Sequence, residues 1–245
     1  MESYNGWPIL TAENCFSKIR ESGIVPWIED PQYGFVEEYF EGAPSQEAFI
    51  KRMNNFNKFA PKTTVSRYKK PNGSKEIDGF KTTFTPYAMV FALIDDYVPV
   101  TAEWKHGNGL ITIVPPAGAP TLDELRFNTL TGAMRFAAMR EWKEETGTYL
   151  SYCVPLSPEN GYWANVRSTQ TQCFLFAGEV KEGSFASQNL DANEDLKMFL
   201  FPLAEWLKLM TTPDLWNGNS DFGLEAVVPT LTFLALRRLG RLNLS

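Results

Sequence analysis

Three glutamates in one short segment have the spacing of a metal site. They are Glu141, Glu144 and Glu145, in the run REWKEETG that begins at Arg140. At about 100° per residue, the three carboxylates fall on one face of a helix and repel one another. A hard divalent cation relieves this repulsion and takes the oxygens as ligands. Arg140 can fix the rotamer of a neighbouring glutamate, and Gly147 suits the left-handed position after a helix end.

The competing interpretation is a solvated helix face that happens to be rich in glutamate. A pair of adjacent glutamates carries no information by itself. The spacing R-E-x-x-E-E-x-G fixes five positions, and chance produces it on the order of once per million sites at average residue usage. The pattern therefore favours the metal site.

The acidic segment needs a helix and a buried sheet to hold it. Helical spacing predicts a helix over 132–146, and a Pro-Asn-Gly turn at 71–73 predicts a hairpin between 64–68 and 80–86. Further strands are predicted at 87–93, 110–114, 172–178 and 197–201, and further helices at 203–210 and 227–239. This mixture predicts the α/β class, as an α/β/α sandwich with helices on both faces of a mixed sheet.

The sequence divides into an N-terminal extension, 1–60, and a main domain, 61–245. Within the extension, Ser45 can cap a helix over 45–58, so the extension is expected to be partly helical. Three roles are open for it: it could cap the sheet, mediate a dimer or bind a partner.

The charge balance bears on the class of partner. The net charge is −6, whereas a broad nucleic-acid surface needs clustered lysine and arginine. The cluster Arg237, Arg238 and Arg241 is interpreted as the cationic end of a helix. The first residues have neither the basic flank nor the apolar length of a signal or membrane helix. We therefore expect no long nucleic acid and no membrane as partners.

Cysteine and histidine usage excludes other kinds of site. The three cysteines, Cys15, Cys153 and Cys173, have no metal-site spacing and are expected to be free thiols in a reducing compartment, the cytoplasm. His106 is the one histidine, which argues against a histidine triad or a multi-histidine metal site. Its simplest role is structural.

The acidic segment resembles the core of the Nudix box, G-x5-E-x7-R-E-U-x-E-E-x-G-U, where U is a bulky aliphatic residue. The arginine, the three glutamates and Gly147 match, while Trp142 and Thr148 occupy the two U positions. Gly132 stands where the family has its first glutamate, and residues 119–130 look like an insertion inside the box. Asp123 or Glu124 could supply the missing carboxylate.

The flanking sequence resembles the ADP-ribose pyrophosphatases of the same family. Residues 106–118 are similar to their R-H-G-x-G…E-L-P-A-G stretch, although Val114 replaces the glutamate. Residues 66–73 resemble their N-terminal hairpin, and 191–195 with the following elements resemble their C-terminal half. The resemblance covers about residues 63–240.

The resemblance implies roles for individual residues. Glu141 and Glu145 would be metal ligands, Glu144 a further ligand or a bridge through water, and the backbone carbonyl of Ala117 another ligand. Glu194 would be a ligand or the base that activates water. Arg140 would complete the catalytic set.

Two further positions are less determined by the resemblance. Ala192 stands where related enzymes often have a second glutamate, so the identity of the general base stays open. Tyr162 and Trp163 fall where such enzymes carry a substrate loop; the alternative is a loop that these aromatics anchor in the core.

The implied activity is hydrolysis of a nucleoside diphosphate linked to another moiety, with Mg²⁺, or Mn²⁺, as the cofactor. ADP-ribose would give AMP and ribose 5-phosphate. Nucleotide sugars, NADH or FAD, and capped RNA are alternative substrates. A non-catalytic binding module of Nudix fold is the alternative from another class. A homodimer is expected by analogy with the family.

Overall fold

The computed structural model describes residues 3–4, 6–26, 62–69, 76–105, 109–127, 129–163, 169–181, 188–190 and 195–242. The chain divides into two compact units. The first comprises Met1–Trp27, Tyr87–Gly161 and Phe174–Ser245, and the second comprises Ile28–Pro86 and Tyr162–Cys173. This division does not coincide with the expected boundary at residue 60, because the N-terminal residues pack within the first unit.

One sheet of the first unit is built around β5 (Tyr87–Leu93) and β12 (Gln172–Val180). In this sheet β5 lies between β12 and the short β8 (Ala117–Gly118), with which it is antiparallel. The strand β9 (Leu150–Pro155) pairs antiparallel with β12. β8 therefore brings the Pro-Ala-Gly segment beside a strand that is buried along its central five residues.

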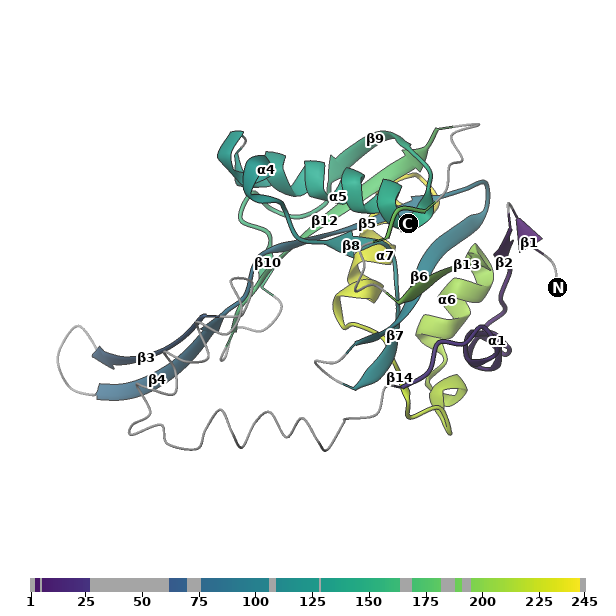
Figure 1. Ribbon diagram of the computed structural model, residues 1–245, viewed down its shortest axis with the longest axis horizontal. Coiled ribbons are helices and arrows are strands. Elements are labelled where there is room, and N and C mark those ends of the chain that lie inside the picture. Colours follow the sequence, from purple (N-terminus) through teal and green to yellow (C-terminus); the bar gives the residue numbers. More distant parts are fainter. Residues whose placement is uncertain are drawn as a thin grey trace. The chain divides into compact units, whose positions relative to one another are not determined.

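Two helices cover the two faces of this sheet (Figure 1). Helix α5 (Leu130–Thr146) packs its apolar side, including Met134 and Trp142, on the face that carries Val90 and Phe174. Successive residues of a strand point to opposite faces, so Phe91 lies on the other face, where α7 (Val227–Arg238) contacts β5. Burial on both faces explains why β5 reads as a continuous apolar run.

The second sheet of this unit is mixed. Its order is β13 (Leu196–Pro202), β6 (Tyr97–Lys105), β7 (Leu110–Val114) and β14 (Phe222–Gly223). The first three strands are antiparallel, and β14 is parallel to β7. Helix α6 (Leu203–Thr211) packs beside β13, and its buried Trp206 donates from Nε1 to Thr232 of α7 at 3.1 Å.

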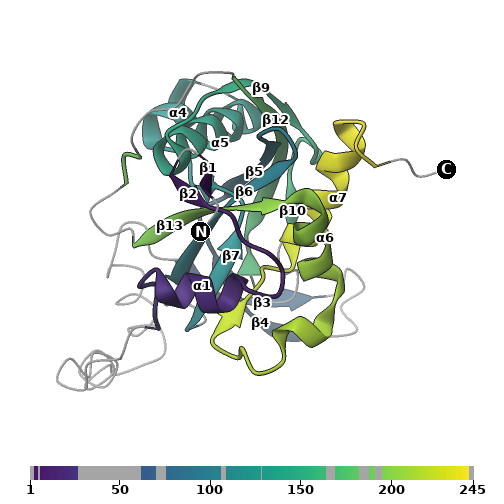
Figure 2. The same ribbon diagram turned by 90° about the vertical axis from the view of Figure 1, so that its right-hand side faces the viewer.

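The N-terminal residues dock on this second sheet (Figure 2). After the small ribbon of β1 (Ser3–Tyr4) and β2 (Trp7–Pro8), the chain bridges β13, where Leu10 N–H donates to Leu200 at 2.8 Å. Helix α1 (Cys15–Glu21) follows, and Phe16 packs edge-on against Trp216, at the end of the 3₁₀ turn η2 (Pro213–Trp216), with ring centroids 5.0 Å apart. The segment thus covers the exposed edge of β13, which an open sheet has to protect.

The second unit contains a hairpin of β3 (Lys62–Lys69) and β4 (Glu76–Thr83), with β11 (Thr169–Gln170) parallel to β4. The predicted hairpin is confirmed, while its turn at 71–73 lies outside the described residues. The dipeptide β10 (Tyr162–Trp163) pairs antiparallel with the start of β12.

The predicted α/β class with mixed sheets is confirmed, and the seven predicted strands and helices from residue 87 onward are present within a few residues of their expected bounds. The predicted helix at 45–58 lies outside the described residues. The longer elements that had not been predicted are β6, β9, helix α1 and helix α4 (Leu122–Phe127), which lies in the insertion. The three cysteines are free and buried, and within the described ranges no helix is long and apolar enough to cross a membrane.

Candidate functional site

Helix α5, which carries the acidic segment, is fixed at both ends. At its start, Thr129 caps the helix by accepting a hydrogen bond from Gly132 N–H at 3.2 Å. At its end, Gly147 adopts the predicted left-handed conformation, with φ of 65°, and its N–H donates to Lys143 at 2.8 Å. The acidic side chains therefore project from a helix with satisfied ends.

The two unusual residues of the segment are paired with each other. Trp142 and Thr148 stand where the Nudix pattern has aliphatic residues, and both are fully buried. The Trp142 indole Nε1–H donates to the Thr148 hydroxyl at 2.7 Å. A buried indole N–H needs such an acceptor. The two departures from the pattern thus compensate each other chemically.

Arg140 lies at the centre of the acidic cluster. Its Nη1 lies 2.8 Å from Glu141 Oε1 and 2.8 Å from Glu144 Oε2. Its Nε donates to Glu124 Oε1 at 3.2 Å, and its Nη2 donates to the carbonyl oxygen of Ala119 at 2.7 Å. One guanidinium therefore organises three carboxylates and one carbonyl group.

The carboxylates of this cluster stabilise the positive charge of Arg140. Burial opposes the charge on Arg140, but the negative charge of Glu141 and the hydrogen bonds to Glu124 and Glu144 outweigh it and raise the pKa of the guanidinium above its ordinary value. Three carboxylates around one cation leave a net negative charge. The cluster can accept further positive charge.

Glu145 points to the interior side of the helix, and it is only 4% exposed. A separate segment docks on the backbone at this point: Asn189 N–H donates to the Glu144 carbonyl at 2.9 Å, and the Gln188 side chain donates to the Glu145 carbonyl. This segment leads toward Glu194, which itself lies outside the described residues.

Gly118 lies directly against the carboxylate of Glu141. A Cβ atom added to Gly118 would lie 2.0 Å from Glu141 Cδ and 2.1 Å from its Oε1. Only a residue without a side chain permits this approach. The close contact brings β8, with the peptide of Ala117, to the acidic face of α5.

The donor set has the chemistry that a hard divalent cation takes. It consists of carboxylate oxygens beside a strand backbone, the ligand type that Mg²⁺ prefers. Within the described part of the chain, no group of three or more histidine, cysteine, aspartate or glutamate side chains is arranged to hold a metal ion. Instead, Glu141 and Glu144 both face the same nitrogen of Arg140, so two carboxylates already converge on one positively charged point.

Glu124 is one of the two residues that the sequence offered for the missing carboxylate, without a choice between them. Of the two suggested carboxylates, Asp123 is 80% exposed and pairs with Arg126, whereas Glu124 is 16% exposed and contacts Arg140. A local sequence pattern could have distinguished Glu124 from Asp123. Thr121 and Glu124 form a capping box, T-x-x-E, in which each side chain bonds the backbone N–H of the other.

The other predicted positions are not brought to this cluster by the described contacts. Tyr162 and Trp163 belong to the second unit, where their side chains are 37% and 46% exposed. Their role in substrate binding stays a prediction. His106 and Ala192 lie outside the described residues. Val114, which replaces a family glutamate, is buried in β7.

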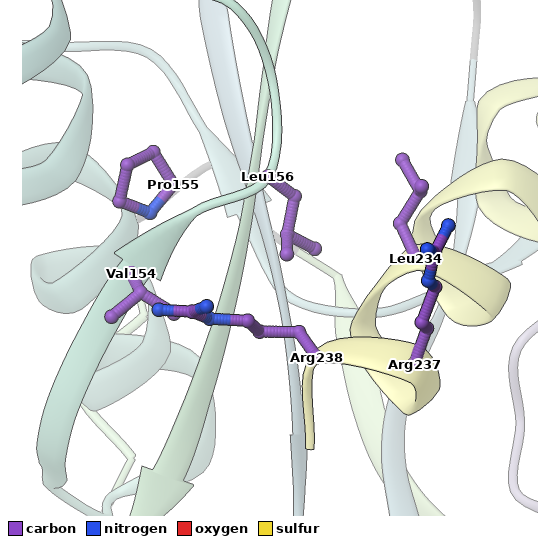
Figure 3. A pocket seen from close by; sticks show the side chains of 6 residues that line it. All are labelled: Val154, Pro155, Leu156, Leu234, Arg237 and Arg238. Carbon is purple, nitrogen blue, oxygen red and sulfur yellow. The ribbon is translucent and has the colours of Figure 1, made fainter. Parts of the chain in front are cut away.

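A pocket of about 540 Å³ lies in the first unit, away from these residues (Figure 3). It is lined by apolar side chains from the end of β9, the residue after it and α7, together with two arginines: Val154, Pro155, Leu156, Leu234, Arg237 and Arg238. The arginines occupy the last turn of α7, where a positive charge interacts favourably with the negative end of the helix dipole. None of the candidate site residues lines this pocket.

The fold is similar to that of a solved structure described as an ADP compounds hydrolase. The TM-score is 0.54 and the sequence identity 19%, over 74% of this chain and 89% of that chain. No family model matches the sequence, and none of the curated proteins matches it. At this level of identity, the likeness shows a shared α/β fold.

The Trp142–Thr148 pair predicts coupled effects on stability. Thr148→Val should lower the free energy of unfolding by about 1–3 kcal/mol, because the buried indole N–H loses its acceptor. In a Trp142→Phe background the same change should cost much less, since no N–H is stranded. Urea denaturation of the four proteins measures the difference, and equal losses in both backgrounds would contradict the pairing.

The contact at Gly118 predicts a local effect. Gly118→Ala should keep the fold and displace the Glu141 carboxylate, at a cost of about 1 kcal/mol, because one flexible side chain changes rotamer. Gly178→Ala is the control: its Cβ would meet the Tyr152 carbonyl oxygen at 2.8 Å, and backbone cannot rotate away, so about 1–3 kcal/mol is expected. Denaturation and a crystal structure of Gly118→Ala test this, and an unmoved Glu141 would refute it.

Proposed function

We propose that the chain is a Mg²⁺-dependent pyrophosphohydrolase of Nudix type, which acts on a nucleoside diphosphate linked to another moiety. The observation that carries this proposal is the set of α5 carboxylates organised by Arg140 and packed against Gly118. The fold similarity to an ADP compounds hydrolase supports the same class of reaction. ADP-ribose is the leading substrate, with AMP and ribose 5-phosphate as products.

The proposed ligands are Glu141, Glu144, Glu145 and the carbonyl oxygen of Ala117, with Glu194 as a ligand or the base. A bound Mg²⁺ would neutralise charge on the diphosphate and make a water molecule more acidic. Arg140 orients Glu141 and Glu144 by holding one oxygen of each. In the reaction, a water oxygen forms a bond to one phosphorus, the bridging P–O bond breaks, and the base takes the proton.

The alternative of a non-catalytic binding module rests on the departures at Val114, Gly132 and Ala192. Two features weigh against it. The three glutamates of the segment and Arg140 are all retained, and Arg140 has a glutamate partner from the insertion. A site that had lost its chemistry has no need to retain this set.

The first test of the proposal is Glu145→Gln. We expect turnover to fall by at least about 100-fold, because a buried carboxylate proposed to act at the reacting centre loses its charge while its shape is kept. Glu21→Gln, at an exposed position of α1, is the matched control and should retain full activity. Steady-state rates and circular dichroism check both variants; an unchanged rate in Glu145→Gln would favour the binding module.

The second test concerns the substrate. Purified protein is incubated with ADP-ribose, NADH, nucleotide sugars and capped RNA, with Mg²⁺ or with a chelator, and products are identified by mass. We expect AMP and ribose 5-phosphate from ADP-ribose only when Mg²⁺ is present. Cleavage of capped RNA alone would reject ADP-ribose as the leading substrate.

A further inference from the structure

We infer that helix α4 completes the active site from within the insertion: Glu124 positions Arg140 in the role that Gly132 has no side chain to fill. This inference rests on the proposed function, since it concerns the same carboxylates. If α4 has this role, residues 119–127 belong to the active site, and Glu124 is a positioning residue for the metal ligands.

Both oxygens of Glu124 are engaged. Oε1 accepts from Arg140 Nε at 3.2 Å, and Oε2 accepts from Thr121 N–H at 2.6 Å. The N–H of Glu124 donates in turn to the Thr121 hydroxyl at 3.2 Å. The capping box thus fixes the rotamer of Glu124. A carboxylate held in one orientation can in turn orient the Arg140 guanidinium that it binds.

The guanidinium is planar, so two anchored nitrogens determine the direction of the third. Glu124 anchors Nε, and the Ala119 carbonyl oxygen anchors Nη2 at 2.7 Å. Both anchors come from the insertion. Nη1 is thereby directed between Glu141 and Glu144, each 2.8 Å away.

Neighbouring groups do not replace this contact. Asp123 is 80% exposed and lies 3.4 Å from Arg126 on the same short helix. Gly132 uses its N–H for the Thr129 cap and carries no side chain. Among the residues that the structure describes, Glu124 is therefore the carboxylate outside α5 that contacts Arg140.

The test is Mn²⁺ binding to the full chain, followed by electron paramagnetic resonance of the free ion. Glu124→Gln should weaken binding about tenfold, the lower end of the usual effect of removing a residue that orients a metal ligand. Asp123→Asn removes the same charge at the adjacent position. Its Mn²⁺ affinity should stay within about twofold of that of the unmodified chain, because an exposed surface charge contributes little. Circular dichroism and thermal unfolding show whether each variant is folded.

The same change is then made in an Arg140→Ala background. Because Glu124 acts through Arg140, Glu124→Gln should have no further effect on Mn²⁺ binding there, whereas a role limited to capping α4 would not depend on Arg140. Full Mn²⁺ affinity in Glu124→Gln, or a loss that persists without Arg140, overturns the inference.

The outcomes separate this inference from the proposed function. Tight Mn²⁺ binding that depends on Glu124, together with no hydrolysis of any tested diphosphate, rejects the function and supports the inference. Hydrolysis with unchanged Mn²⁺ binding in Glu124→Gln supports the function and rejects the inference. An unmodified chain that does not bind Mn²⁺ rejects both.

Discussion

The candidate site depends on one guanidinium that is shared among carboxylates from two helices. Arg140 has its charge in a partly buried position, where an unpaired cation would be costly, and Glu141, Glu144 and Glu124 make that position tolerable. The converse is equally important. Without Arg140 the acidic side chains would repel one another. The arginine and the glutamates therefore stabilise each other's charges at this position.

The parts of this site that follow from local rules could be predicted from the sequence. Helix α5 and its left-handed Gly147 follow from helical spacing and from the conformational freedom of glycine, which are properties of neighbouring residues. β5 was visible as an apolar run because both of its faces are buried. β6 was missed because Pro99 interrupts the strand pattern, and a proline normally argues against a strand there.

The remaining features depend on contacts between distant residues, which no local pattern determines. Glu124 and Arg140 are sixteen positions apart, and the length of the insertion between them hides the contact. Gly118 and Glu141 meet only because β8 pairs with β5 beneath the helix. The fold likeness at 19% identity has the same origin, since buried pattern and topology specify the architecture while most individual residues are free to differ.

The Trp142–Thr148 hydrogen bond also constrains the order in which this helix could have acquired its residues. An indole introduced first would have buried an N–H with no acceptor, whereas a hydroxyl introduced first could bond the neighbouring Thr146, whose Oγ1 lies 2.8 Å away. A tryptophan acquired before any acceptor stood at position 148 would therefore cost stability, whereas a threonine acquired first would not. Loss of the threonine while the tryptophan remains carries the same cost.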